Sequence, residues 1–279
     1  MTPAMGADSG ASFYGQAEAP FALAALNDSP AREFAESMPE RYRRVFDAAA
    51  ASEHAAIVAR RGGEAIHIEA WRELPDGGVC LCVVARDGPG LLALLSASFI
   101  AREIDVVAAH AFCRALSDGS TEAVDFFWLR RAPGVERQEP LAADEVGELA
   151  SQLAAQWGPR ADGEAMALAA NLPRPRMAPT MRTHVSFSDS PDDGGFVLTV
   201  QTHDRPGLLL AITRTLFESG LRISRSEVRT RSGVVCDRFH LLEQDGSAVP
   251  EDTRRRVQAD VHASVTSLAT EEPSSRAKR

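Results

Sequence analysis

A six-residue phrase occurs twice in this chain, and the duplication constrains its fold more than any other feature. Asp87-Gly88-Pro89-Gly90-Leu91-Leu92 and Asp204-Arg205-Pro206-Gly207-Leu208-Leu209 match at an offset of 117 residues. Each copy follows an apolar, strand-like run and precedes a run with apolar residues at helical spacing. Two strand–turn–helix corners of the same kind predict a chain built from two similar units.

The repeat continues on both sides of the corner. Before it, Asp76-Gly77-Gly78 matches Asp193-Gly194-Gly195, and Asp-Gly between strand-like runs indicates a hairpin. After it, Leu92, Leu95 and Phe99 recur as Leu209, Ile212 and Leu216, a helical stripe. The predicted strands are 66–69, 79–85, 106–113 and 123–129 in the first unit and 183–187, 196–202, 223–230 and 234–242 in the second, with second helices at 141–157 and 250–265.

The predicted order, strand, strand, helix, strand, strand, helix, occurs twice. It implies an α+β fold of two ferredoxin-like units (βαββαβ-type), each an antiparallel sheet with helices on one face. Because nothing strand-like follows the last helix, the edge strand of the second unit must come from before Phe196. We expect the following boundaries: a largely disordered extension at 1–38, a helical linker at 39–62, units at 64–178 and 183–266, and a disordered tail at 267–279.

Composition excludes several classes of function. The formal net charge of −9 argues against general binding to nucleic acid or acidic membranes. We find neither a signal peptide nor an apolar run near the ~18 residues of a membrane span, so we expect a cytoplasmic protein. Lys278 is the only lysine, which excludes enzymes that need a phosphate-loop or Schiff-base lysine. The four cysteines are interpreted as buried packing residues rather than metal ligands.

The repeated corners, together with Asp125-Phe126-Phe127 and Asp237-Arg238-Phe239, resemble the ACT domain. Two such units in tandem, preceded by Met38-Pro39-Glu40-Arg41-Tyr42, are similar to the C-terminal regulatory region of bacterial PII uridylyltransferase/uridylyl-removing enzymes, over about residues 38–265. The resemblance implies allosteric sensing of an amino acid, in that enzyme glutamine, at interfaces between ACT units.

The corners are the candidate ligand sites. Glycine lets the backbone approach a ligand, and the unpaired N–H groups of the helix start suit an amino-acid carboxylate. Asp87 and Asp204 would meet the amino group, or would instead cap the helix. Candidate ligand-binding residues are Asp87, Gly88, Pro89, Gly90 and Leu91 in the first corner and Asp204, Arg205, Pro206, Gly207 and Leu208 in the second.

Asp105 and Arg222 complete the candidate set. They stand where many ligand-binding ACT units have Asn, at the start of the strand after the first helix. Asp105 would pair with an ammonium group and Arg222 with a carboxylate, or both are plain exposed charges. His203-Asp204 resembles the metal-binding pair of HD phosphohydrolases but lacks the further ligands, so we predict no metal. The sequence also has no Gly-Ser loop with a following acidic pair of the nucleotidyltransferase kind, and we predict no cofactor and no catalytic residue.

The faces of the two sheets opposite their helices differ in character. We expect the apolar face of the first unit to be covered by the N-terminal extension or by a partner, and the charged face of the second to be solvated. We interpret His110, on the first face, as a hydrogen-bonded buried histidine rather than a ligand contact. The first face carries Cys80, Cys82, Val84, Val107, Ala108, His110, Phe112, Phe126 and Trp128, and the second Thr199, Gln201, Ser224, Arg225, Glu227, Arg229, Arg238 and His240.

The leading hypothesis is a non-catalytic regulatory protein that binds an amino acid at its two corners and acts through packing between units. Its partners would be the amino acid and either a second copy in a homodimer or a catalytic protein. One alternative is the regulatory fragment of a PII-modifying enzyme that works with a separate catalytic chain. Another is a ligand-free interaction module resembling the tandem-ACT glycine-cleavage repressor proteins.

Overall fold

The computed structural model describes residues 20–75, 77–132, 141–157, 182–190 and 195–267. Both predicted units are present in element order. The first unit consists of β1 (Ile66–Glu73), β2 (Val79–Arg86), α4 (Leu91–Ala101), β3 (Ile104–Ala115), β4 (Thr121–Arg131) and α5 (Ala143–Gln156). The second consists of β5 (His184–Asp189), β6 (Phe196–His203), α7 (Leu208–Glu218), β7 (Leu221–Arg231), β8 (Val234–Glu243) and α8 (Glu251–Ser267). Asp76 and the 193–194 pair of the predicted hairpin turns lie outside the described residues.

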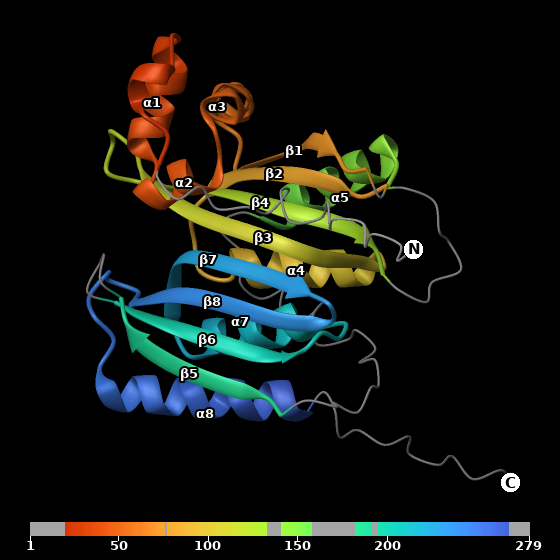
Figure 1. Cartoon of the computed structure of the whole chain (residues 1–279), viewed down its shortest axis with the longest axis vertical. Helices are drawn as coiled ribbons and strands as arrows, with labels where there is room; N and C mark the ends of the chain where they lie inside the picture. Colours follow the sequence, from red (N-terminus) through yellow and green to blue (C-terminus); the bar gives the residue numbers. More distant parts are fainter. Residues whose placement is uncertain (1–19, 76, 133–140, 158–181, 191–194, 268–279) are drawn as a thin grey trace, which may run out of the picture.

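The eight strands of the described chain form one antiparallel sheet in the order β1-β2-β4-β3-β7-β8-β6-β5 (Figure 1). Each half has the ferredoxin-like arrangement, with its edge strand supplied from before the corner. β5 pairs with β6 and forms the outer edge of the second unit, as predicted for a strand preceding Phe196. The α+β prediction is confirmed, although the two predicted sheets are joined into one.

The joint between the halves is the pairing of β3 with β7. Ala108 pairs with Arg229 and Phe112 with Arg225, so that His110 lies opposite Glu227, its own equivalent at the repeat offset of 117. An antiparallel pair centred on equivalent residues places the two units around a local two-fold axis. The units are therefore related by symmetry as well as by sequence.

Helices α4, α5, α7 and α8 cover one face of this sheet, and a single apolar core runs beneath them through both units. In the strands, Leu81 and Val83 point into this core, as do Leu198 and Val200 in the second unit. Their neighbours at alternate positions point to the other face because side chains alternate along a strand.

The opposite face of the first unit is covered by the N-terminal segment, which was one of the two covers expected for it. Tyr42 and Phe46 pack against Phe112, Phe126 and Trp128 in a second apolar cluster, which is separate from the helix-covered core. The covering elements are the 3-10 helix η2 (Leu23–Ala25), α1 (Ser29–Ser37), α2 (Glu40–Val45) and α3 (Ala48–Arg61).

Two details of this segment differ from the sequence expectation. Helix α1 lies within 1–38, which was expected to be largely disordered, and its Phe34 is buried in the second cluster. The helix predicted across 39–61 is broken at Phe46, where the backbone is extended. Asp47 then caps α3 by accepting a 2.8 Å hydrogen bond from the Ala50 N–H, so a local capping signal interrupts the helical pattern.

Buried polar contacts fix the covering helices in place. Glu122 on β4 is 2% exposed and accepts hydrogen bonds from Arg61 of α3 and Arg114 of β3, each at 2.8 Å. The Tyr42 hydroxyl lies 2.7 Å from His54 Nδ1 inside the cover. Burial of these groups without partners would be costly, so the pairs specify where the cover docks.

In the second unit, the sheet face opposite the helices carries polar strand residues. Arg238 and Gln201 are exposed on it, and the remaining predicted residues are half-buried, so this face is solvated in part. On the covered face, His110 is buried and stacked on Phe112, and burial lowers its pKa to about 4. Cys80 and Cys82 are buried as predicted, whereas Cys113 and Cys236 are half-buried; all four are free thiols.

Charge substitution should distinguish the covered face from the solvated one. Trp128→Asp places a carboxylate in the second apolar cluster, where the Trp128 side chain is 5% exposed, and should lower the free energy of unfolding by at least about 3–5 kcal/mol. Arg238→Asp, on the exposed face, should change it by no more than about 1 kcal/mol. Urea denaturation monitored by circular dichroism measures both, and equal losses would contradict the assignment of the two faces.

Candidate functional site

The two corners have the same backbone conformation. Gly90 and Gly207 adopt φ values of 85° and 83° at the N-caps of α4 and α7, a left-handed conformation that favours glycine. No side chain caps either helix, so the helix-capping interpretation of Asp87 and Asp204 is wrong. Each aspartate precedes the cap glycine by three residues, and its carboxylate is directed to other partners.

The two-fold arrangement makes each corner face the other unit. The Asp87 corner meets the start of β7, including Arg222, and the Asp204 corner meets the start of β3, including Asp105. The predicted site residues therefore form two sets, and each set combines the corner of one unit with the strand residue, Arg222 or Asp105, of the other unit. The sequence could not indicate this exchange because no local pattern predicts the pairing of β3 with β7.

The first corner is closed by an ion pair between units. Arg222 donates from Nε and Nη2 to Asp87 Oδ2 at 3.2 and 2.8 Å, and Thr121 Oγ1 donates to the same oxygen at 3.2 Å. Burial lowers the pKa of the Arg222 guanidinium, but Asp87 beside it raises the pKa overall. The Phe217 ring lies 3.1 Å from where a Cβ on Gly90 would be, and only about 50 Å³ of space remains.

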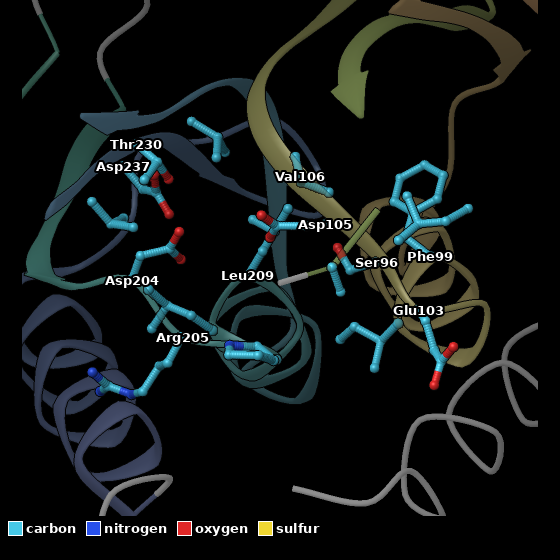
Figure 2. Close-up of a pocket in the computed structure, with 18 of the residues that line it drawn as sticks. Ser96, Phe99, Glu103, Asp105, Val106, Asp204, Arg205, Leu209, Thr230 and Asp237 are labelled. Carbon is cyan, nitrogen blue, oxygen red and sulfur yellow. The ribbon is translucent and has the colours of Figure 1, made fainter. Parts of the chain in front are cut away.

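The second corner is open and contains a cavity of about 340 Å³ (Figure 2). Asp204 and Asp105 both line it, although Arg130 holds Asp105 through Nε and Nη2 at 3.0 and 2.9 Å from Oδ2. Burial raises the pKa of the Asp204 carboxyl, and the charge of Asp105 raises it further. A half-buried carboxylate beside a second one is a site that attracts a cation.

Arg205 is anchored away from the cavity. Its guanidinium donates to Thr202 Oγ1 at 3.2 Å and to the carbonyls of His203 and Val265 at 3.1 and 2.7 Å. Figure 2 shows the side chain directed toward α8, to which Val265 belongs. Arg205 therefore borders the cavity with its backbone, and its guanidinium ties α8 to the corner instead of contacting a ligand.

Two buried aspartates were not among the predicted site residues. Asp125 on β4 and Asp237 on β8 are equivalent, line the first and second cavities respectively, and are 3% and 1% exposed. Asp125 accepts the Phe112 N–H at 3.3 Å, and Asp237 accepts the Arg229 N–H at 3.2 Å. The repeated Asp-x-Phe pattern was the signal that could have identified them, since an aspartate between apolar strand residues is unusual.

Replacing a buried carboxyl by an amide, which cannot ionise, should change how stability depends on pH. Burial raises the pKa of Asp237 well above its ordinary value, so the folded state holds a proton that the unfolded state releases as pH rises above ~4. Asp237→Asn cannot ionise, and its melting temperature should gain on that of the wild type between pH 5 and pH 8. Asp260→Asn, exposed on α8, is the control. Parallel melting profiles for all three proteins would contradict burial of an ionisable group.

The described residues contain no group of three or more His, Cys, Asp and Glu side chains placed to hold a metal ion. In the same part of the chain, no helix combines the length and apolar character needed to cross a membrane. The residues of the repeated corners line two of the cavities in this part of the structure.

No protein-family model matches the chain. It is 27% identical over 234 residues to the bifunctional uridylyltransferase/uridylyl-removing enzyme of Gluconobacter oxydans (strain 621H). The aligned residues make up 82% of this chain and 24% of that enzyme. It is 26% identical over 232 residues to the enzyme of the same name from Phenylobacterium zucineum (strain HLK1), covering 82% and 24%. The enzyme of the same name from Rhodospirillum rubrum is 26% identical over 220 residues, which make up 75% of this chain and 22% of that enzyme.

The chain spans about a quarter of the length of these curated relatives. The similarity extends across most of the chain and hence across both units. The duplicated corners indicated a resemblance to these enzymes, and the relatives confirm it. This chain resembles a region of the bifunctional uridylyltransferase/uridylyl-removing enzyme.

Proposed function

We propose that this chain is a non-catalytic regulatory protein in which two ACT-like units bind one amino acid at the Asp204 corner. The observation that carries the proposal is the cavity of about 340 Å³ between the corner of the second unit and the start of β3 in the first. Ligand-sized cavities lined by apolar groups with a few convergent polar ones are the usual form of small-molecule sites.

The chemistry of the cavity suits an amino acid. The N-terminus of α7 begins at the corner, where backbone N–H groups favour a carboxylate. Asp204, with Asp105 nearby, favours the ammonium group. Phe99 and Val228 belong to the apolar part of the lining, against which a side chain would pack. The resemblance to the uridylyltransferase family makes glutamine one candidate among the amino acids.

The position of the cavity suggests how binding would be transmitted. A ligand there would touch α4 and β3 of the first unit as well as the corner and β7 of the second. Its binding energy would therefore favour one packing of the units over others, which is the requirement for a regulatory response.

The second candidate function is that of a regulatory fragment that acts with a separate catalytic chain. The length relation favours it, because the chain spans only 24% of the first two relatives, which are named as enzymes. Co-purification of this chain with a nucleotidyltransferase, and a change in that enzyme's activity on mixing, would support the fragment function. Unchanged activity on mixing would contradict it.

A screen of the twenty amino acids by thermal shift tests the ligand site. A ligand at 100 times its Kd stabilises the folded state by about 2.7 kcal/mol, which should raise the melting temperature by several degrees. Asp204→Asn should abolish the response because the ammonium group loses its charged partner. Asp87→Asn, the equivalent change in the closed corner, should keep it. No response of the wild type to any amino acid at millimolar concentration would refute amino-acid sensing.

A further inference from the structure

The closed corner provides an internal template for the open one. In the closed corner, the carboxylate of Asp87 is neutralised by a guanidinium that reaches across from the other unit, with Arg222 Nη2 at 2.8 Å. Asp87 is thereby left 10% exposed at its side chain. The corner thus holds a cation on its aspartate, supplied by the chain itself.

The same two positions have different residues in the open corner. The equivalent of Arg222, at an offset of 117, is Asp105, so the cation is replaced by a second carboxylate. The equivalent of Phe217 is Ile100, and no atom lies within 4 Å of a Cβ built on Gly207. These two exchanges coincide with the difference between a cavity of about 50 Å³ and one of about 340 Å³.

The charge and polarity of the open cavity follow from its lining. Its charged residues other than Arg205, which is turned toward α8, are all acidic. Arg130 already holds Asp105, which makes Asp204 the principal anchor for an incoming cation. The remaining wall is mostly apolar, with side chains from both units: Phe99, Ile100, Ile104, Val106, Val228 and Val235.

We infer that the open cavity takes a ligand with a cationic nitrogen and an aliphatic body, and that Arg222 is a tethered occupant that keeps the first corner from binding the same ligand. The cationic nitrogen takes the place at Asp204 that the guanidinium takes at Asp87. The inference rests on the proposed ligand site and narrows its chemistry: the ammonium group and an apolar side chain are recognised, and a polar side-chain amide is not required.

A series of related small molecules tests the ligand class on the full chain. L-Leucine, its decarboxylated form 3-methylbutan-1-amine and its deaminated form 4-methylpentanoate share an aliphatic body and differ in charge. In thermal shift and calorimetric titration, the amine and L-leucine should bind and 4-methylpentanoate should not. Asp204→Asn should weaken binding of the amine at least about tenfold, and Asp87→Asn should leave it unchanged.

The outcomes separate this inference from the proposed function. Binding of 4-methylpentanoate as tightly as the amine would overturn the cationic requirement. Binding of L-glutamine in preference to L-leucine would keep amino-acid sensing and overturn the aliphatic ligand class. Binding of the amine with no amino acid binding would keep the ligand class and refute sensing. Binding of none of these molecules would refute both.

Exchange of the two distinguishing residues tests the role of Arg222. The double variant Arg222→Asp, Phe217→Ile copies the open corner into the closed one, and the amine should then bind at two equivalents per chain rather than one. Arg222→Ala alone is the milder variant if the double variant does not fold, as judged by circular dichroism. A stoichiometry of one in a folded variant would show that the closed corner is excluded by something other than its resident cation.

Discussion

The pairing of β3 with β7 is the interaction on which the rest of the structure depends. Because it is antiparallel and centred where His110 faces Glu227, it relates the two halves of the repeat by a local two-fold axis. That axis determines what each corner meets: Asp87 meets Arg222 and Asp204 meets Asp105, always across the unit boundary. Neither cavity would exist in an isolated unit, so both are properties of the joined sheet.

The sequence predicts the elements well because their signals are local. Apolar runs between turn signals define the strands, and the apolar character of Cys82 and Trp128 on the far face correctly requires a cover. The sequence could not predict the contacts that depend on the pairing of β3 with β7. Above all, it could not predict that Asp105 would lie at the Asp204 corner and Arg222 at the Asp87 corner. Arg205 illustrates the same limit, since nothing near it in sequence indicates that its guanidinium binds the carbonyl of Val265.

The repeat shows how little has to change to convert one kind of corner into another. Gly90 and Gly207 hold the same left-handed conformation, and a buried aspartate lies below each corner, Asp125 in one and Asp237 in the other. The backbone and the buried acid are therefore the common scaffold. The side chain at the start of the facing strand decides whether the corner aspartate is neutralised from within, as by Arg222, or left beside another carboxylate.

That second arrangement leaves two carboxylates, Asp105 and Asp204, in the lining of one cavity. Burial raises the pKa of Asp204, the neighbouring charge of Asp105 raises it further, and Arg130, which holds Asp105, offsets part of the effect. In the closed corner, the same fold places Arg222 against the corner aspartate Asp87, at the position where the open corner has a second carboxylate. Local arrangements that sacrifice stability where the fold has a stable alternative are expected at functional sites. A ligand that supplies the missing cation would relieve the repulsion, and binding would thus be coupled directly to the packing of one unit on the other.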